Sequence, residues 1–308
     1  MKIIYSSDNH ITLDAPICRT DDFVETLRNK LIWLKDLIKK HNAVFLNGGD
    51  IADVSRYSSP NKTIEWLRFM FSNFPECYFV YGNHTLPHHR LDYRDKSVIA
   101  PLVSAGVCNP IDEPVEITDN VWVHGFHFGQ EIAPFDESLY PEDSKHIAVI
   151  HAYVYKEDTS MIAGYNAKQL LYDNPQYDMI LSGDHHSPFT VTLDDQVLIN
   201  SGPLYRGSID KINLKPVVWI IDTDDMSYEA IPVPIIDGVI STEHKDKVTH
   251  KTNTMESVVN VVKNSESVVL SFDTELESII AENQDLVDNH VREYIDIVTE
   301  KEETYSRS

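Results

Sequence analysis

Residues 2–10 read KIIYSSDNH, a short apolar run that is followed by Asp8, Asn9 and His10. The run predicts a buried β-strand over Lys2–Ser6, because it is too short for a helix and carries β-branched and aromatic residues. Polar side chains directly after such a strand lie at its carboxyl end, which is where α/β sheets bind ligands. This stretch therefore predicts the fold class, α/β, and the position of a site.

Four further motifs follow apolar runs in the same way. They are GDIAD (residues 49–53), GNH (82–84), His151 and GDHH (183–186). Singly each is a weak signal, because a capping or hydrogen-bonded residue at a strand end explains it equally well. The ordered set predicts that aspartate, histidine and asparagine side chains converge on one site. Such ligands favour Mn, Fe, Zn or Mg over a thiolate-bound metal.

Short apolar runs alternate with amphipathic stretches up to about residue 233, which is typical of a layered α/β domain. We expect helices over residues 22–41 and 63–71, the first ending in a basic turn. The four last runs are separated by short polar turns and predict antiparallel strands. After the first strand, the expected strands are 43–46, 78–81, 121–124, 147–151, 179–181, 189–193, 197–200, 217–222 and 228–233.

Composition excludes several classes of protein. The 308 residues include 26 basic and 49 acidic residues, a net charge of −23, which argues against a broad basic surface that binds polyphosphates by counterion release. Three widely spaced cysteines exclude a disulfide framework and a thiolate zinc finger, and favour a reducing cytoplasm. No run of 18 apolar residues and no leader pattern occurs, so we expect neither secretion nor membrane insertion.

The chain changes character after about residue 235. Residues 264–308 hold 12 acidic against 3 basic residues, and their apolar positions fall on one helical stripe. We therefore expect one domain over residues 1–235 and an acidic, largely helical extension over 236–308. A helix packed on its own domain, a homodimer contact and a partner surface all remain open. The stripe comprises Leu276, Ile279, Ile280, Val287, Val291, Tyr294 and Val298.

The ordered motifs resemble the calcineurin-like metallophosphoesterase family, whose pattern is D-x-H, G-D-x-x-D, G-N-H, a lone His and G-H-x-H. The resemblance covers about residues 1–235. It implies a four-layer metallophosphoesterase sandwich, in which two mixed β-sheets are flanked by helices. It also implies hydrolysis of a phosphodiester by a hydroxide held on two divalent ions, with Mn favoured over Mg, Fe or Zn.

The resemblance also assigns roles to individual residues. Asp184 replaces the first histidine of G-H-x-H and would be a harder ligand, with His185 as the alternative. His84 would stabilise the transition state and protonate the leaving oxygen, and Asp53 would orient it. The remaining ligands would be Asp8, His10 and His186 for the first metal, Asp50 as the bridge, and Asn83 and His151 for the second metal.

Two comparisons with branches of this family bear on the class of substrate. Residues 53–55 and 84–85 lack the G-D-x-x-D-R-G and G-N-H-E patterns of the protein phosphatase branch. The spacing from Asp8 to Asp50 and the stretch NSGPLYR (residues 200–206) are instead similar to SbcD-type nucleases, including short phage-encoded relatives. That similarity implies DNA as the substrate, an SbcC-type coiled-coil ATPase as a partner and a role in DNA repair.

Two loops, residues 55–62 and 85–94, mix basic and aromatic side chains that can contact phosphates and stack on bases. Two alternatives to a nuclease stay open: a phosphatase or phosphodiesterase acting on small nucleotides, and a catalytically inactive scaffold. The expected substrate contacts are Arg56, Lys62, His88, His89, Arg90 and Arg206.

Overall fold

The computed structural model describes residues 1–156 and 164–242. Chain contacts separate a compact unit over Met1–Ser241 from a second unit over Thr242–Ser308. The predicted acidic helix with its apolar stripe lies outside the described residues. Within the described part of the chain, no helix has the length and apolarity needed to cross a membrane.

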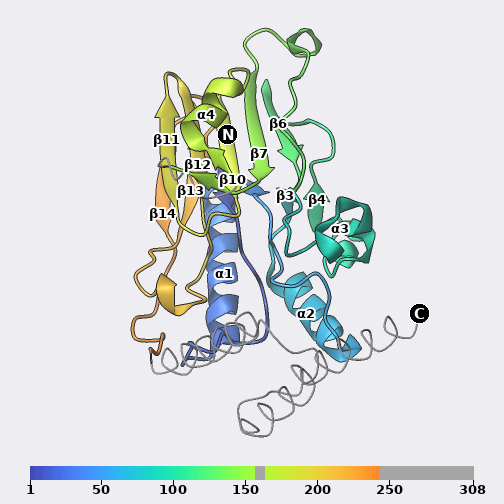
Figure 1. The fold of residues 1–308 in the computed structure, drawn as a ribbon, viewed down its shortest axis with the longest axis vertical. Coiled ribbons are helices and arrows are strands. Elements are labelled where there is room, and N and C mark those ends of the chain that lie inside the picture. Colours follow the sequence, from blue (N-terminus) through green and yellow to red (C-terminus); the bar gives the residue numbers. More distant parts are fainter. Residues whose placement is uncertain (157–163, 243–308) are drawn as a thin grey trace, which may run out of the picture. The chain divides into compact units, whose positions relative to one another are not determined.

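The first sheet has six strands in the order β14-β13-β1-β2-β3-β4 (Figure 1). Strands β1 to β4 run parallel, whereas β13 pairs antiparallel with both β1 and β14. The carboxyl ends of β1, β2 and β3 therefore lie at the same edge. The bounds are β1 (Lys2–Ser6), β2 (Val44–Asn47), β3 (Cys77–Phe79), β4 (Cys108–Pro110), β13 (Val217–Asp222) and β14 (Tyr228–Pro232).

The second sheet has the order β11-β12-β10-β7-β6-β5. Its four central strands are parallel and its two edge strands are antiparallel. A separate parallel pair is formed by β8 (Val154–Tyr155) and β9 (Tyr165–Asn166). The bounds are β5 (Val115–Thr118), β6 (Val121–Phe126), β7 (Lys145–His151), β10 (Met179–Gly183), β11 (Phe189–Leu193) and β12 (Gln196–Asn200).

The longest described helix, α1, is capped at both ends. The Asp22 side chain accepts a hydrogen bond from the Glu25 N–H, and Asn42 ends the helix in a left-handed conformation. The described α-helices are α1 (Phe23–His41), α2 (Pro60–Asn73), α3 (Ala100–Ser104) and α4 (Ala167–Asp173). The short 3-10 helices are η1 (Pro87–His89), η2 (Leu91–Lys96), η3 (Glu137–Leu139) and η4 (Ile209–Lys211).

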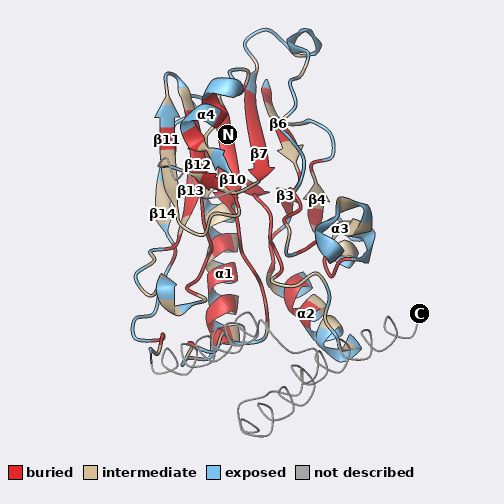
Figure 2. Cartoon of the chain, in the orientation of Figure 1, coloured by how far each residue is buried: buried red, intermediate tan, exposed pale blue. Residues whose placement is uncertain are grey.

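Side-chain alternation along the strands produces four layers. Ile4 points to one face of the first sheet and packs with Leu31 of α1 in a core that also includes α2 residues. Ile3 points to the other face and packs with Val149 of the second sheet. The far face of that sheet is covered by α4, whose Leu170 lies in a third core. Strands buried on both faces occupy the centre of the unit (Figure 2), so the predicted sandwich is confirmed.

The order of the last strands differs in part from the expectation. The pairs β11–β12 and β13–β14 are antiparallel as predicted. However, β12 pairs parallel with β10, and β13 joins β1 in the other sheet. Short turns fix the local hairpins, whereas residues 201–216 carry the chain to the other sheet. The first unit also continues beyond residue 235, because the Ser241 N–H donates to the Cys18 carbonyl oxygen.

Candidate metal centre

The ligands expected from the sequence converge where the carboxyl ends of the parallel strands meet. Asp8 and His10 follow β1, Asp50 follows β2 and His151 ends β7. Side-chain ligand atoms form three groups, and within each group they lie within 4.8 Å of one another. The groups are Asp8, His10 and His186; Asp8, Asp50 and His151; and His10, Asp53 and His84.

One half of the centre is formed around His10. Its Nε2 atom lies 3.1 Å from Nε2 of His186 and 4.0 Å from Oδ2 of Asp50. The same nitrogen of His186 lies 3.7 Å from Oδ1 of Asp8. Two imidazole nitrogens and a carboxylate oxygen therefore face a common point.

The other half is formed around His151. Its Nε2 atom lies 3.3 Å from Asp50 Oδ2, 3.1 Å from Asn83 Oδ1 and 4.0 Å from Asp184 Oδ1. Its Nδ1 atom lies 2.7 Å from the Gly48 carbonyl oxygen, to which it donates. This hydrogen bond fixes Nδ1 as the donor to the backbone, so Nε2 is the nitrogen that faces the carboxylates.

The carboxylates of the centre are held by neighbouring donors. Asp8 accepts from the Ser7 hydroxyl over 2.6 Å and from the Asp184 N–H over 2.9 Å. Asp50 accepts at Oδ1 from the His84 N–H over 2.9 Å. Its buried Oδ2 atom has no hydrogen-bond partner among the described residues.

Four ligand candidates have left-handed backbones. Their φ angles are 51° at Asp8, 42° at His10, 49° at Asp50 and 82° at Asp184. Non-glycine residues adopt this region at a cost of roughly 1–2 kcal/mol each. Strain of this kind is concentrated at functional sites, where the surrounding structure enforces it.

Glycines allow the chain to approach these side chains closely. A Cβ on Gly82 would lie 2.1 Å from Oδ1 of Asp50, and one on Gly49 would lie 2.2 Å from Nδ1 of His151. The glycine of each motif is thus required by the neighbouring ligand. Neither position tolerates a side chain without displacing that ligand.

The electrostatic field of the centre favours positive charge. Burial disfavours the charged form of His151, yet Asp50, Asp8 and Asp184 raise its pKa to about 10. Burial alone would raise the pKa of Asp50, but the charge of the nearby His151 brings it to about 2. Burial also raises the pKa of Asp184 above its usual value.

These observations fit a centre for divalent cations. The buried Oδ2 atom of Asp50 lies 3.3 Å from Nε2 of His151 and 4.0 Å from Nε2 of His10 without a well-aligned hydrogen bond to either, so a bound cation would complete its interactions. The surrounding donors are carboxylate oxygens, imidazole nitrogens and an amide oxygen. That set suits Mn, Mg, Fe or Zn.

The comparisons with known proteins agree with this geometry. A family model described as calcineurin-like phosphoesterase matches residues 1–188, which is well over half of the chain. The chain belongs to the calcineurin-like phosphoesterase family. Among curated proteins, no sequence matches the chain.

Three solved structures are similar to this phosphoesterase over most of its length. An archaeal phosphodiesterase is 16% identical, with 75% of this chain and 99% of that chain covered and a TM-score of 0.39. A protein assigned as a 5′-nucleotidase from Staphylococcus aureus is 13% identical, with 82% and 58% covered and a TM-score of 0.48. Vps29 from Entamoeba histolytica, complexed with zinc, is 11% identical, with 76% and 100% covered and a TM-score of 0.36.

Asp53 contacts two different histidines of the phosphoesterase. Its carboxylate lies 3.2 Å from Nδ1 of His10, whereas its backbone carbonyl oxygen lies 3.1 Å from Nδ1 of His84. The sequence-based expectation that Asp53 orients His84 therefore applies to the backbone, and the side chain orients His10. The hydrogen bond from His10 lowers the pKa of Asp53.

The structure distinguishes between Asp184 and His185 as candidates for the metal ligand. The imidazole of His185 lies between the rings of Tyr153 and Phe189, each 5.2 Å away, and its Nδ1 is 3.1 Å from the Ser187 carbonyl oxygen. Neither residue belongs to the three ligand groups, so the direction of each side chain decides between them. The Asp184 carboxylate faces His151, so the geometry favours Asp184 as the ligand.

The residues that were expected to contact the substrate differ in burial and in their partners. Arg206 is a correction: it is buried, and its guanidinium donates to the Ile212 and Ile236 carbonyl oxygens, so it faces no substrate. Lys62 is exposed and paired with Asp14. His89 donates from Nδ1 to the Asn83 carbonyl oxygen over 2.9 Å when that nitrogen is protonated.

Two supporting residues were not found from the sequence. Tyr205 donates its hydroxyl to the His10 carbonyl oxygen over 2.8 Å, whereas the sequence-based prediction named only the adjacent Arg206. Ser7 holds Asp8. A serine directly before the D-x-H aspartate was the available signal for Ser7. No local pattern distinguishes Tyr205 from its neighbours.

Proposed function

We propose that the protein is a two-metal phosphodiesterase that cleaves DNA strands, with Mn as the preferred metal. The observation that carries this proposal is the position of Asp50, whose buried Oδ2 faces His10 on one side and His151 on the other without a well-aligned hydrogen bond to either. A carboxylate shared by two ligand groups suits a pair of ions that hold one phosphate between them. Bound ions would activate water and neutralise charge at the phosphate.

The protein groups then supply binding and proton transfer. His84 is exposed at the edge of the centre, while its N–H is fixed on Asp50 and its Nδ1 on the Asp53 carbonyl oxygen. This leaves Nε2 of His84 as the atom that donates a proton to the leaving oxygen. The carboxylate of Asp53 keeps His10 in its orientation.

A basic cluster, formed mainly in the segment that follows His84, supports a DNA strand as the substrate. Lys96 and Arg90 lie over the ring of Tyr93 at 4.9 and 5.4 Å, and the His88 ring is 5.4 Å from it. Arg56 Nη2 lies 3.5 Å from His88 Nε2. A cationic cluster around an aromatic ring, on a chain of net charge −23, suits phosphates that flank the cleaved bond.

The test compares the rate of hydrolysis of a small phosphate ester with that of DNA. We expect Mn-dependent hydrolysis of both bis-p-nitrophenyl phosphate and single-stranded or double-stranded DNA, abolished by chelation. Arg56→Gln combined with Lys96→Gln should lower kcat/KM on DNA about tenfold and leave the small ester unchanged. Lys39→Gln combined with Lys40→Gln, at the end of α1, is the matched control. Equal losses on both substrates would refute the role of the cluster.

The net charge favours a second candidate. A chain with 49 acidic and 26 basic residues repels long polyanions, so a small nucleotide is the alternative substrate. Cleavage of a cyclic nucleotide or a nucleoside monophosphate, without cleavage of DNA, would establish it. A purified protein that binds no metal would instead indicate an inactive scaffold. Under the nuclease proposal, an SbcC-type ATPase is the proposed partner, in the cytoplasm.

A further inference from the structure

Tyr205 connects a segment far along the chain to the backbone of the metal-ligand candidate His10. Its hydroxyl donates to the His10 carbonyl oxygen over 2.8 Å, and its ring packs edge-on against Phe23 of α1, with 5.1 Å between the ring centroids. Only 6% of Tyr205 is exposed, and burial raises the pKa of its hydroxyl, which therefore keeps its proton and acts as the donor. The hydrogen bond joins residues that lie 195 positions apart in the sequence.

The backbone of His10 needs support because its conformation is strained. Its φ angle of 42° lies in the left-handed region, which sterically disfavours residues other than glycine. The His10 N–H donates to the Asp50 carbonyl oxygen over 2.8 Å, and the Asp53 carboxylate lies 3.2 Å from Nδ1 of the ring. These two contacts come from the GDIAD motif, whereas Tyr205 belongs to a different part of the chain. Contacts on the N–H, the carbonyl oxygen and the ring together determine where Nε2 of His10 points.

Arg206 holds the neighbouring Tyr205 in place. Its buried guanidinium donates to the Ile212 carbonyl oxygen over 3.0 Å and to the Ile236 carbonyl oxygen over 2.6 Å. Its own carbonyl oxygen accepts from Nη1 of Arg19 over 3.2 Å. Because both the side chain and the backbone of Arg206 are fixed, Tyr205 has little freedom to move away from His10.

The segment that contains Ile236 is itself tied to α1. The buried ammonium group of Lys30 on α1 donates to the carbonyl oxygen of Pro234, two residues before Ile236. A hydrogen bond from a charged donor is stronger than one between neutral groups, so this contact holds the segment firmly. A chain of buried contacts therefore runs from α1 and this segment to the backbone of His10.

The histidine in the other half of the centre is supported by different residues. Nδ1 of His151 donates to the carbonyl oxygen of Gly48, which directly follows β2. The bond is 2.7 Å long and orients the ring from the side of the first sheet. A change at Tyr205 should therefore affect the half formed by His10 and spare the half formed by His151.

We propose, on the basis of the two-metal function above, that Tyr205 and Arg206 are positioning residues that set the affinity of the His10 half of the centre for its divalent ion. Loss of the Tyr205 hydroxyl leaves the His10 carbonyl oxygen without this donor, so the strained backbone relaxes. Nε2 of His10 then turns away from the common point that it shares with His186 and Asp8.

Tyr205→Phe removes the hydroxyl and keeps the ring. We titrate the metal-free full chain with Mn²⁺ and follow the free ion by electron paramagnetic resonance. The affinity for one of the two ions should fall about tenfold, while the affinity for the other changes less than twofold. Arg206→Lys keeps the charge but lacks the fork that contacts two carbonyl oxygens, so it should weaken the same ion several-fold. Equal weakening of both ions, or of neither, would overturn the proposal.

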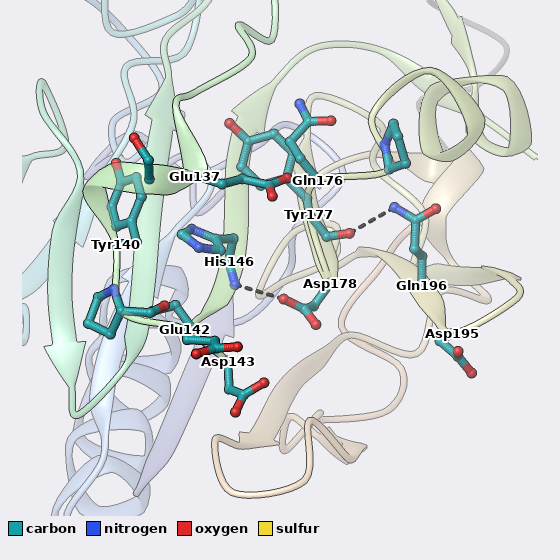
Figure 3. A pocket seen from close by; sticks show the side chains of 14 residues that line it. Glu137, Tyr140, Glu142, Asp143, His146, Gln176, Tyr177, Asp178, Asp195 and Gln196 are labelled. Atoms are coloured by element: carbon teal, nitrogen blue, oxygen red, sulfur yellow. Dashed lines mark hydrogen bonds between the residues drawn. The ribbon is translucent and has the colours of Figure 1, made fainter.

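Tyr177→Phe is the matched control. Tyr177 is 1% exposed and its hydroxyl donates to the Ala133 carbonyl oxygen over 3.1 Å, so this variant also loses one buried hydrogen bond to the backbone. Tyr177 lies before the amino end of β10, near His146 and Asp178 (Figure 3), whereas Asp184 follows the carboxyl end of that strand. Both tyrosine variants should lose a similar amount of stability in urea, but Tyr177→Phe should change neither Mn²⁺ affinity more than twofold. Equal losses of affinity in both variants would reduce Tyr205 to a general structural role.

A spectroscopic readout separates the positioning role from the two-metal function. In the metal-free chain, the imidazole NMR signals of His10, assigned by their absence in His10→Asn, should shift in Tyr205→Phe and stay unchanged in Tyr177→Phe. Unchanged signals in Tyr205→Phe would refute the positioning role even if two ions bind. If the signals shift but the unmodified chain binds fewer than two ions, the two-metal function alone is refuted.

Discussion

Oδ2 of Asp50 lies 3.3 Å from Nε2 of His151, and both side chains are almost completely buried. The contact joins the end of β2 in the first sheet to the end of β7 in the second. A charge buried at the junction of two sheets is stable only if it is compensated. The contact therefore makes the geometry of the metal centre depend on how the two sheets pack.

Asp50→Asn tests the bridging position. The amide removes one negative charge and presents an N–H₂ group where a cation would bind, so we expect loss of both Mn equivalents and of activity. Metal content after dialysis, measured by atomic emission, is the readout. Retention of two full-affinity ions in this variant would contradict the bridging role.

His84→Ala tests the proton donor. Metal binding should be retained, because His84 contributes only its backbone N–H to Asp50. The rate should fall on the order of 100-fold or more for DNA, whose leaving oxygen needs a proton, and much less for a p-nitrophenyl ester. An equal loss on both substrates would assign His84 to transition-state stabilisation rather than to proton transfer.

Asp53→Asn should have a different effect. The backbone carbonyl that holds His84 remains, but the carboxylate on His10 is lost. We expect a roughly 10–100-fold weaker metal affinity, as is typical when a carboxylate behind a histidine ligand is removed. The ratio of rates on DNA and p-nitrophenyl esters at saturating Mn should match that of the unmodified protein.

The sequence predicted the convergence of the ligands because each motif directly follows a parallel strand, and the carboxyl ends of parallel strands share one edge. The role of Arg206 could not be predicted in this way, since its burial depends on residues 212 and 236. The cluster around Tyr93 depends on two 3-10 turns with left-handed residues at His88 and His89. Local patterns also cannot determine which sheet β13 joins, because that pairing spans about 200 residues.

Gly82→Ala should lower both metal affinity and stability, because the added Cβ would lie 2.1 Å from Asp50 Oδ1 and 2.6 Å from the Asp50 backbone nitrogen. Gly106→Ala tests backbone strain without a steric clash. The Cβ added at Gly106 would meet no atom within 4 Å, but the backbone φ of this residue is +72°. We expect the Gly106 variant to lose about 1 kcal/mol of stability and to keep full activity. Urea unfolding and Mn titration of both variants check these outcomes.

Stability should fall as the pH drops from about 6.5 to about 4. Burial, together with the nearby His146, lowers the pKa of His124 to about 4, so the folded state binds fewer protons than the unfolded state in this window. The loss is complete below the folded pKa and absent above the unfolded one. In chelator, His124→Phe should show a smaller decrease in urea midpoint between pH 7 and pH 4.5. Identical decreases in both proteins would contradict the shift.

Asp184 gives the most directional prediction about metal choice. A carboxylate in place of an imidazole adds negative charge and a harder donor, so the centre should prefer Mn or Mg over Zn. Asp184→His should remain active and shift the preference towards Zn, since histidine also tolerates the left-handed φ of 82° better than most residues. Asp184→Ala should weaken the ion held with His151 at least tenfold.

His185→Ala is the matched control for Asp184→Ala. The His185 imidazole packs between Tyr153 and Phe189, away from the ligand groups. The variant should retain Mn affinity and activity, with any effect limited to stability. Titration of Mn and Zn into all three variants, followed by hydrolysis of bis-p-nitrophenyl phosphate, decides between the two residues. Full affinity in Asp184→Ala together with an inactive His185→Ala would transfer the ligand role to His185. The local turn must then rearrange, because the His185 imidazole now packs between Tyr153 and Phe189 while the Asp184 N–H holds Asp8.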